Sequence, residues 1–91
     1  MTDSMAKFLI VDNMLRSATK SDGSTDLSTC YDIYEFFDIV PISKSKYDEL
    51  MYQMKNDGYI EIVYPTECSP TYRVFVTSSG ADFCAKMKAK I

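Results

Sequence analysis

Apolar residues along this chain recur mostly at the three-to-four-residue spacing of an amphipathic helix. The first such segment, residues 5–19, predicts a helix, and the polar run KSDGSTD at 20–26 predicts a loop after it. Polar residues such as Lys7 and Asp12 fall away from the apolar side of this helix. The predicted apolar side consists of Met5, Phe8, Leu9, Val11, Leu15 and Ala18.

A second helix is predicted over residues 26–39, DLSTCYDIYEFFDI. Asp26 or Ser28 can cap its free N–H groups, and Pro41 ends it by favouring an extended Val40. Residues 39–42 then form a short connector. The apolar stripe of this predicted helix is Cys30, Ile33, Tyr34 and Phe37.

The third predicted helix leads directly into a hairpin. Ser43 is placed as its N-cap and Gly58 as its C-terminal cap. The segments 59–64 and 72–77 are rich in β-branched and aromatic residues, which predicts two strands joined by PTECSPT. The apolar stripe of the third helix is Tyr47, Leu50, Met51 and Met54.

A final helix is predicted over residues 79–91, where Thr77 or Ser78 can act as its N-cap. The lysines near its end interact favourably with the helix dipole. The expected element order is therefore α-α-(short turn)-α-β-β-α, an α+β fold. The apolar stripe of the final helix is Phe83, Cys84, Met87 and Ile91.

Length and composition fit one globular domain spanning residues 1–91, with 46% apolar and 25% charged residues. No apolar run approaches the roughly 20 residues that cross a bilayer, so no membrane partner is expected. The N-terminus has no basic region before its apolar stretch and no small-residue cleavage site after it, unlike a secretory signal. We expect a cytoplasmic protein.

Two helices joined by a short connector, and followed at once by a hairpin, form a helix-turn-helix unit with a wing. The segments ISKSKYDELMYQMKNDGYIEIV and YRVFVTSSGADF are similar to the corresponding parts of MarR-type winged-helix proteins. Thr77 and Gly80 match the Thr-x-x-Gly start of their last helix. By size and element order the chain also resembles the YjcQ family of small Gram-positive and phage proteins. The resemblance covers residues 5–89 and implies a winged helix-turn-helix fold.

The third helix would then be the reading helix for DNA. Lysines at its start can contact phosphates or guanine edges, while Gln53 or Asn56 can pair with adenine. The resemblance also suggests that Arg73, on the wing, reaches a minor groove. The predicted contacts on the helix are Ser43, Lys44, Ser45, Lys46, Glu49, Gln53 and Asn56.

Charge opposes this interpretation, because affinity for DNA comes largely from basic side chains and the sequence pI is about 4.7. The alternative is a protein–protein interaction module that does not bind DNA, with exposed Tyr52 and Tyr64 supplying contact area. A third interpretation is that Lys44 and Lys46 are simply solvated at the start of the helix and contact no partner. The supposed reading unit is neutral, with Lys44, Lys46 and Lys55 against Asp48, Glu49 and Asp57.

Dimerisation offers one way to reconcile DNA binding with the acidic composition. A homodimer through the first and last predicted helices can gather Lys44 and Lys46 from two copies into one stripe. The resemblance suggests this use of the terminal helices. Ile10 and Met14, which broaden the apolar face of the first helix, support it.

An enzyme is not expected. The chain has no histidine, no Gly-rich phosphate loop and no metal-ligand cluster, so no cofactor or metal is predicted. Its three cysteines are expected to be small buried or half-buried apolar side chains in a reducing compartment. The leading expectation is a DNA-binding transcriptional regulator or accessory protein of a bacterial or phage genome.

Overall fold

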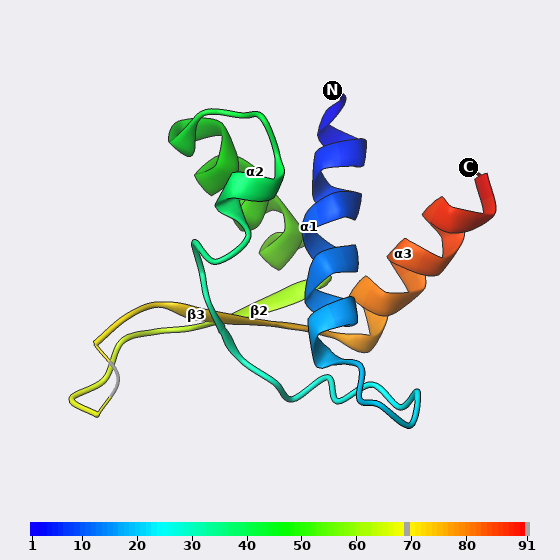
Figure 1. The fold of residues 1–91 in the computed structure, drawn as a ribbon. Helices are drawn as coiled ribbons and strands as arrows, with labels where there is room; N and C mark the ends of the chain where they lie inside the picture. Colours follow the sequence, from blue (N-terminus) through cyan, green and yellow to red (C-terminus); the bar gives the residue numbers. More distant parts are fainter. Residues whose placement is uncertain (69, 91) are drawn as a thin grey trace.

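Three α-helices and a three-stranded antiparallel sheet make up the part of the chain that the computed structural model describes, residues 1–68 and 70–90 (Figure 1). The strands lie in the order β1-β3-β2. Ile91, predicted on the stripe of the last helix, and Ser69, in the predicted hairpin loop, lie outside the described residues. The elements are α1 Asp3–Ala18, β1 Tyr31–Asp32, the 3-10 helix η1 Phe37–Ile39, α2 Lys44–Asn56, β2 Ile60–Val63, β3 Arg73–Val76 and α3 Ser78–Lys90.

Helix α1 is the central element of the core. The hydroxyl of Thr2 caps it by accepting a hydrogen bond from the Met5 N–H at 3.1 Å. It contacts α2, α3, η1 and β3, so three sides of the helix are covered (Figure 1). Ile10, Val11 and Met14 have no exposed surface. The predicted first helix is therefore confirmed, with a wider buried face than its apolar stripe suggested.

The prediction of a helix over residues 26–39 is wrong. This segment runs as an extended chain through β1 and a series of turns, and only the 3-10 turn η1 is helical. The Asp26 and Asp32 carboxylates accept hydrogen bonds from the N–H groups of Ser28 and Tyr34, two residues on. Such local bonds compete with helical ones. The segment buries Phe36 rather than the stripe that the helical interpretation proposed.

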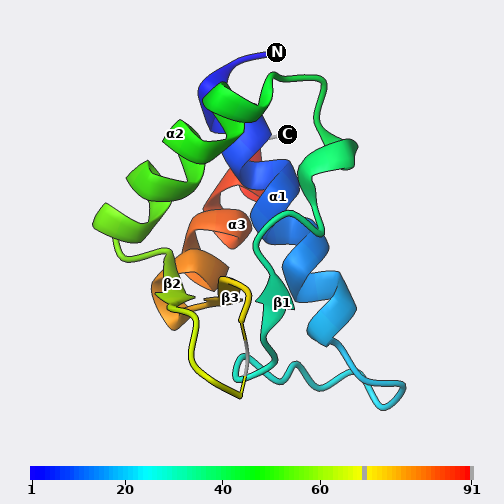
Figure 2. The ribbon, with the colours of Figure 1, turned by 90° about the vertical axis from the view of Figure 1, so that its left-hand side faces the viewer.

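Strand β1 forms because β3 has a free edge there. Tyr31 pairs with Val74 and Asp32 with Arg73, and the Ile33 N–H continues the ladder by donating to the Tyr72 carbonyl. Figure 2 shows β1 beside the hairpin, on the opposite side of β3 from β2. The hairpin thereby becomes a three-stranded sheet.

Helix α2 and the hairpin appear as predicted. The Ser43 hydroxyl caps α2 by accepting from the Lys46 N–H at 3.1 Å. Gly58 adopts a φ of +82°, the left-handed conformation that glycine tolerates best, just after the helix ends. Strands β2 and β3 pair from Ile60 opposite Val76 to Val63 opposite Arg73. The hairpin projects away from the helices on the same side of the molecule as α2 (Figure 1).

A compact junction joins the end of α2, the base of the hairpin and the start of α3. The Thr77 hydroxyl donates to the Gly58 carbonyl and accepts from the Gly80 N–H at 3.1 Å. The Thr77 N–H donates to the Tyr59 carbonyl at 3.1 Å. Gly80 packs so tightly that a Cβ atom there would lie 2.1 Å from the Tyr59 oxygen. The rings of Tyr59 and Phe83 stack beside it at 4.6 Å.

Asp12 is buried, although the sequence pattern placed it on the polar side of the first helix. It is 2% exposed. Its Oδ2 lies 3.0 Å from the Arg16 Nε and its Oδ1 lies 3.1 Å from the Lys88 Nζ, the latter an ion pair without hydrogen-bond geometry. These two cations compensate the buried charge and connect α1 to α3.

The three cysteines differ in exposure. Cys84 is buried and Cys30 half-buried, as expected, but Cys68 is exposed in the hairpin loop. Burial raises the pKa of the Cys84 thiol to about 11, with the Asp12 carboxylate adding to the effect and Lys88 opposing it. Within residues 1–68 and 70–90, no helix has the length and apolar character to cross a membrane.

Substituting Gly80 by alanine tests the junction. We expect Gly80→Ala to lower the free energy of unfolding by about 2–3 kcal/mol, because overpacking a tight site typically costs 1–3 kcal/mol. Urea unfolding followed by circular dichroism measures the change. Ser79→Ala, at the exposed neighbouring position, is the matched control and should stay within about 0.5 kcal/mol of the parent. Equal stability of the two variants would contradict the packing described at Gly80.

Candidate nucleic-acid interface

Helix α2 turns one face into the core and the opposite face to solvent. Tyr47, Leu50, Met51 and Met54 are at most 1% exposed, as their spacing predicted. The other face therefore lies outward. Helix α2 itself lies on the side of the molecule from which the hairpin projects (Figure 1). Its exposed residues are Lys44, Ser45, Asp48, Glu49, Tyr52 and Asn56.

Anchoring by Tyr47 fixes the direction in which this face points. The buried Tyr47 hydroxyl donates a hydrogen bond to the Ile33 carbonyl, at the end of β1. Its ring lies edge-on to Phe37 with centroids 5.2 Å apart. Burial raises the pKa of the Tyr47 hydroxyl, so it stays protonated and remains a donor. Helix α2 is thus held against the segment between β1 and η1.

The two lysines at the start of α2 are engaged within the chain. The Lys46 Nζ lies 3.0 Å from the Asp3 Oδ2 at the start of α1 and 3.5 Å from the Glu49 Oε2. The hydrogen bond that Lys46 donates to Asp3 raises the pKa of Lys46, and the charges of both carboxylates add to the shift. The Lys44 Nζ lies over the Tyr34 ring, 5.1 Å from its centroid. An external phosphate would compete with these partners.

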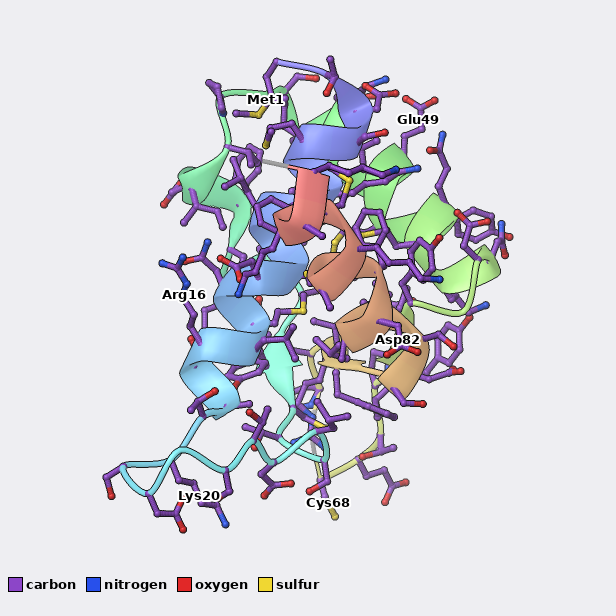
Figure 3. All side chains as sticks on the ribbon, turned by 90° about the vertical axis from the view of Figure 1, so that its right-hand side faces the viewer. Met1, Arg16, Lys20, Glu49, Cys68 and Asp82 are labelled. Carbon is purple, nitrogen blue, oxygen red and sulfur yellow. The ribbon has the colours of Figure 1, made fainter. Side chains whose placement is uncertain are left out.

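The remaining predicted contacts on α2 differ in availability. The Ser43 hydroxyl is used as the N-cap, whereas Ser45 and Asn56 are exposed. The half-buried Gln53 donates from its Nε2 to the Glu49 Oε1 at 3.5 Å. Glu49 itself points outward from α2 (Figure 3).

Arg73 lies apart from the α2 residues, at the first position of β3. It pairs with Val63 on one side and with Asp32 on the other, so its backbone is held in the centre of the sheet. The side chain is half-buried, and its Nε has no hydrogen-bond partner among the described residues. The described part of the hairpin loop carries one charged residue, Glu67. The structure therefore groups the predicted helix contacts on one element and adds no basic wing tip.

Sequence reasoning missed a cleft between α2 and the hairpin. It has a volume of about 290 Å³ and is mostly apolar. Tyr34 lines this cleft from the segment that was predicted to be helical, so the spacing of apolar residues did not indicate the cleft. Tyr52 was predicted to be exposed, but not to face the hairpin. The cleft is lined by Ile33, Tyr34, Asp48, Met51, Tyr52, Lys55, Ile62, Tyr64 and Tyr72.

Known structures share this arrangement of helices and hairpin. The sequence matches no protein-family model and no curated protein. The fold is similar to that of a mutant of MarR from E. coli in a complex with operator DNA, with a TM-score of 0.63 and 16% identity over 89% of this chain. It is also similar to a mutant of the type III plasmid segregation protein TubR, with a TM-score of 0.55 and 13% identity over 100% of this chain.

These likenesses establish a winged-helix fold of the α+β class, as the sequence predicted. The first helix of the predicted helix-turn-helix unit is reduced to turns and η1. The chain spans 50% of the length of the MarR chain and 96% of the TubR chain. Across residues 1–68 and 70–90, no group of three or more His, Cys, Asp or Glu side chains is arranged to hold a metal ion.

Removing the Tyr47 hydroxyl tests the anchoring of α2. We expect Tyr47→Phe to lower the free energy of unfolding by about 1–2 kcal/mol, because the Ile33 carbonyl would lose its partner in a partly buried site. Thermal unfolding measures the loss. Tyr52→Phe, on the exposed face of the same helix, should leave stability unchanged. A Tyr47→Phe protein as stable as the parent would contradict the anchoring role.

Proposed function

We propose that this chain is a small, non-enzymatic winged-helix protein that binds DNA, as a transcriptional regulator or accessory protein of a bacterial or phage genome. One observation supports this most strongly. Helix α2 presents a polar face outward beside a projecting hairpin, in the fold shared by a MarR mutant crystallised with operator DNA. A helix of this kind fits the major groove of DNA.

In this proposal six of the eight predicted contacts have assigned roles. Lys44 and Lys46 meet phosphates or guanine edges at the start of α2, where Ser45 can hydrogen-bond to the DNA backbone. Gln53 and Asn56 read base edges further along the helix. Arg73 reaches the minor groove from β3.

The proposed DNA contact is weak for a single copy, because Asp48 and Glu49 share the face with the lysines. A homodimer through α1 and α3 would double the number of cations on one DNA duplex. Ile10 and Met14, which supported this dimer in the sequence, are buried within the one chain and are not available to a partner. Half-buried Leu9 and Met87 are apolar side chains that these helices still offer. The narrower likeness to the YjcQ family stays a prediction from the sequence.

A second candidate function, binding to another protein, is favoured by the tyrosine-lined cleft and by the net charge of −3. Interfaces are enriched in tyrosine, and an acidic surface does not suit nucleic acid. Both candidates use the side of the molecule that carries α2 and the hairpin.

The DNA proposal predicts salt-dependent binding to a labelled mixed-sequence duplex. With two or three phosphate contacts, affinity should fall roughly 10- to 40-fold between 50 and 200 mM salt, through counter-ion release. Fluorescence anisotropy measures it at both salt concentrations. Lys44→Glu combined with Lys46→Glu should abolish binding. Lys20→Glu combined with Lys90→Glu makes the same charge change away from α2 and should weaken binding far less.

Absence of binding at the lower salt concentration would refute the DNA proposal. If the duplex binds but both double variants lose affinity equally, net charge rather than α2 would carry the interaction. Sedimentation of the free protein and of the complex would then show how many copies bind one duplex. Only monomers in both samples would contradict the dimer.

Releasing Lys46 from Asp3 should strengthen DNA binding. Asp3→Asn removes the carboxylate 3.0 Å from the Lys46 Nζ without changing α2. Because an exposed ion pair holds its partners only weakly, affinity should rise by roughly two- to fivefold. Asp22→Asn, in the loop after α1, is the charge-matched control. An equal gain in both variants would mean that Lys46 is not a specific contact.

A further inference from the structure

Exposed aromatic side chains gather at one place on this molecule. Among the described residues, six large apolar side chains are exposed, and four of these line the cleft between α2 and the hairpin. They come from segments far apart in the sequence, so helical or strand periodicity does not account for their meeting. The four residues are Tyr34, Tyr52, Tyr64 and Tyr72.

The four rings line the cleft together with aliphatic side chains. Tyr64 and Tyr72, at the ends of the hairpin strands, lie edge-on with centroids 5.7 Å apart. Tyr52, from α2, and Tyr34, from the segment after β1, line the same cleft. Ring faces carry negative charge density, so a cluster of this kind attracts cations. The aliphatic side chains that line the cleft, Ile33, Met51 and Ile62, are less exposed than the four tyrosines.

Two of these rings already have a lysine of the same chain lying over them. The Lys44 Nζ lies 5.1 Å from the centroid of Tyr34, and the Lys55 Nζ lies 5.7 Å from that of Tyr52. Both distances fall within the roughly 6 Å at which an ammonium group is attracted to an aromatic face. No cation of the described residues lies over Tyr64 or Tyr72.

A carboxylate without a counter-ion lies in the same cleft. The Asp48 Oδ1 accepts a hydrogen bond from the Tyr34 hydroxyl at 2.9 Å, and this bond raises the pKa of Tyr34. Asp48 forms no ion pair with any described residue. Lys55 lines the cleft too, but seven residues along a helix place it about 10 Å further along the axis. Lys44, one turn before Asp48 on α2, lies over the Tyr34 ring and forms no ion pair with this carboxylate. The Asp48 carboxylate is therefore open to a further cationic partner.

We propose that this cleft binds an arginine side chain presented by a partner protein. The guanidinium group would pair with Asp48 and stack on the free tyrosine rings. Arginine fits better than lysine, because its planar group stacks on aromatic faces and donates two parallel hydrogen bonds to a carboxylate. A nucleic acid fits worse, because a base stacked on these rings would bring its phosphates towards Asp48.

The surroundings of the cleft favour a basic partner. The segment from Tyr31 to Ile39, which supplies one wall, carries three acids and no basic residue. All three are exposed. A basic segment of a partner would be attracted to this side before docking. The three acids are Asp32, Glu35 and Asp38.

A short peptide tests the proposal directly and independently of DNA binding. The probe is an acetylated Gly-Ser-Arg-Gly-Ser peptide, and the same peptide with uncharged citrulline in place of arginine is the control. In NMR titrations of the intact protein, the arginine peptide should shift the ring signals of the four cleft tyrosines in a saturable way. The citrulline peptide should bind at least about tenfold more weakly, because it lacks the charge that strengthens the bond to Asp48.

Two charge variants give opposite results for a peptide and for DNA. Asp48→Asn should weaken arginine-peptide binding about tenfold. Lys55→Gln should strengthen it about twofold, because a like charge in the cleft is removed. DNA in the cleft would reverse both signs. Both residues lie on the surface side of α2, so folding can be verified from the unchanged NMR spectrum outside the cleft.

Equal binding of the two peptides, or an Asp48→Asn protein that binds as well as the parent, would overturn the proposal. A competition experiment with choline gives a further check. If choline displaced the arginine peptide at equal concentration, the proposal would also be overturned, because the cleft would then be a site for small organic cations. A mixed-sequence duplex that shifts the same tyrosines, and binds more tightly to Asp48→Asn, would assign the cleft to the DNA-binding face. Failure of the duplex to bind would leave the peptide result unaffected.

Discussion

The arrangement of this domain depends on the hydrogen bond from the Thr77 hydroxyl to the Gly58 carbonyl. Gly58 follows the end of α2, and Thr77 lies between β3 and α3. One side chain therefore fixes the angle between the outward-facing helix, the hairpin and the last helix. Gly80 completes the joint by letting α3 start in contact with the Tyr59 carbonyl. If this joint opened, the cleft and the polar face of α2 would lose their common orientation.

Much of this architecture was predictable, because its signals are local. The cap at Ser43, the turn at Gly58 and the apolar stripe between them all lie within one element. The segment over residues 26–39 was not predictable in this way. Its partner is the edge of β3, about forty residues further along the chain, and a helical spacing of apolar residues occurs there without a helix. Tertiary pairing overrode the local pattern.

The candidate site was predicted in part for a related reason. Periodicity identified the outward face of α2, because the buried stripe determines its opposite side. It did not reveal that Asp3, 43 residues earlier, pairs with Lys46. Nor did it reveal that Tyr34 and Tyr52 line one cleft, because this depends on the segment that is not helical. Contacts between distant segments decide which polar residues are free to act.

The pair between Lys46 and Asp3 changes how this surface would respond to an anion. A phosphate that binds Lys46 must displace the Asp3 carboxylate, which is part of the same chain and stays close by. Its repulsion of the phosphate offsets part of the free energy gained when cations condensed on the nucleic acid are released. The face would thus behave as if it held fewer cations than its sequence contains, and its preference among anions would rest more on geometry than on charge.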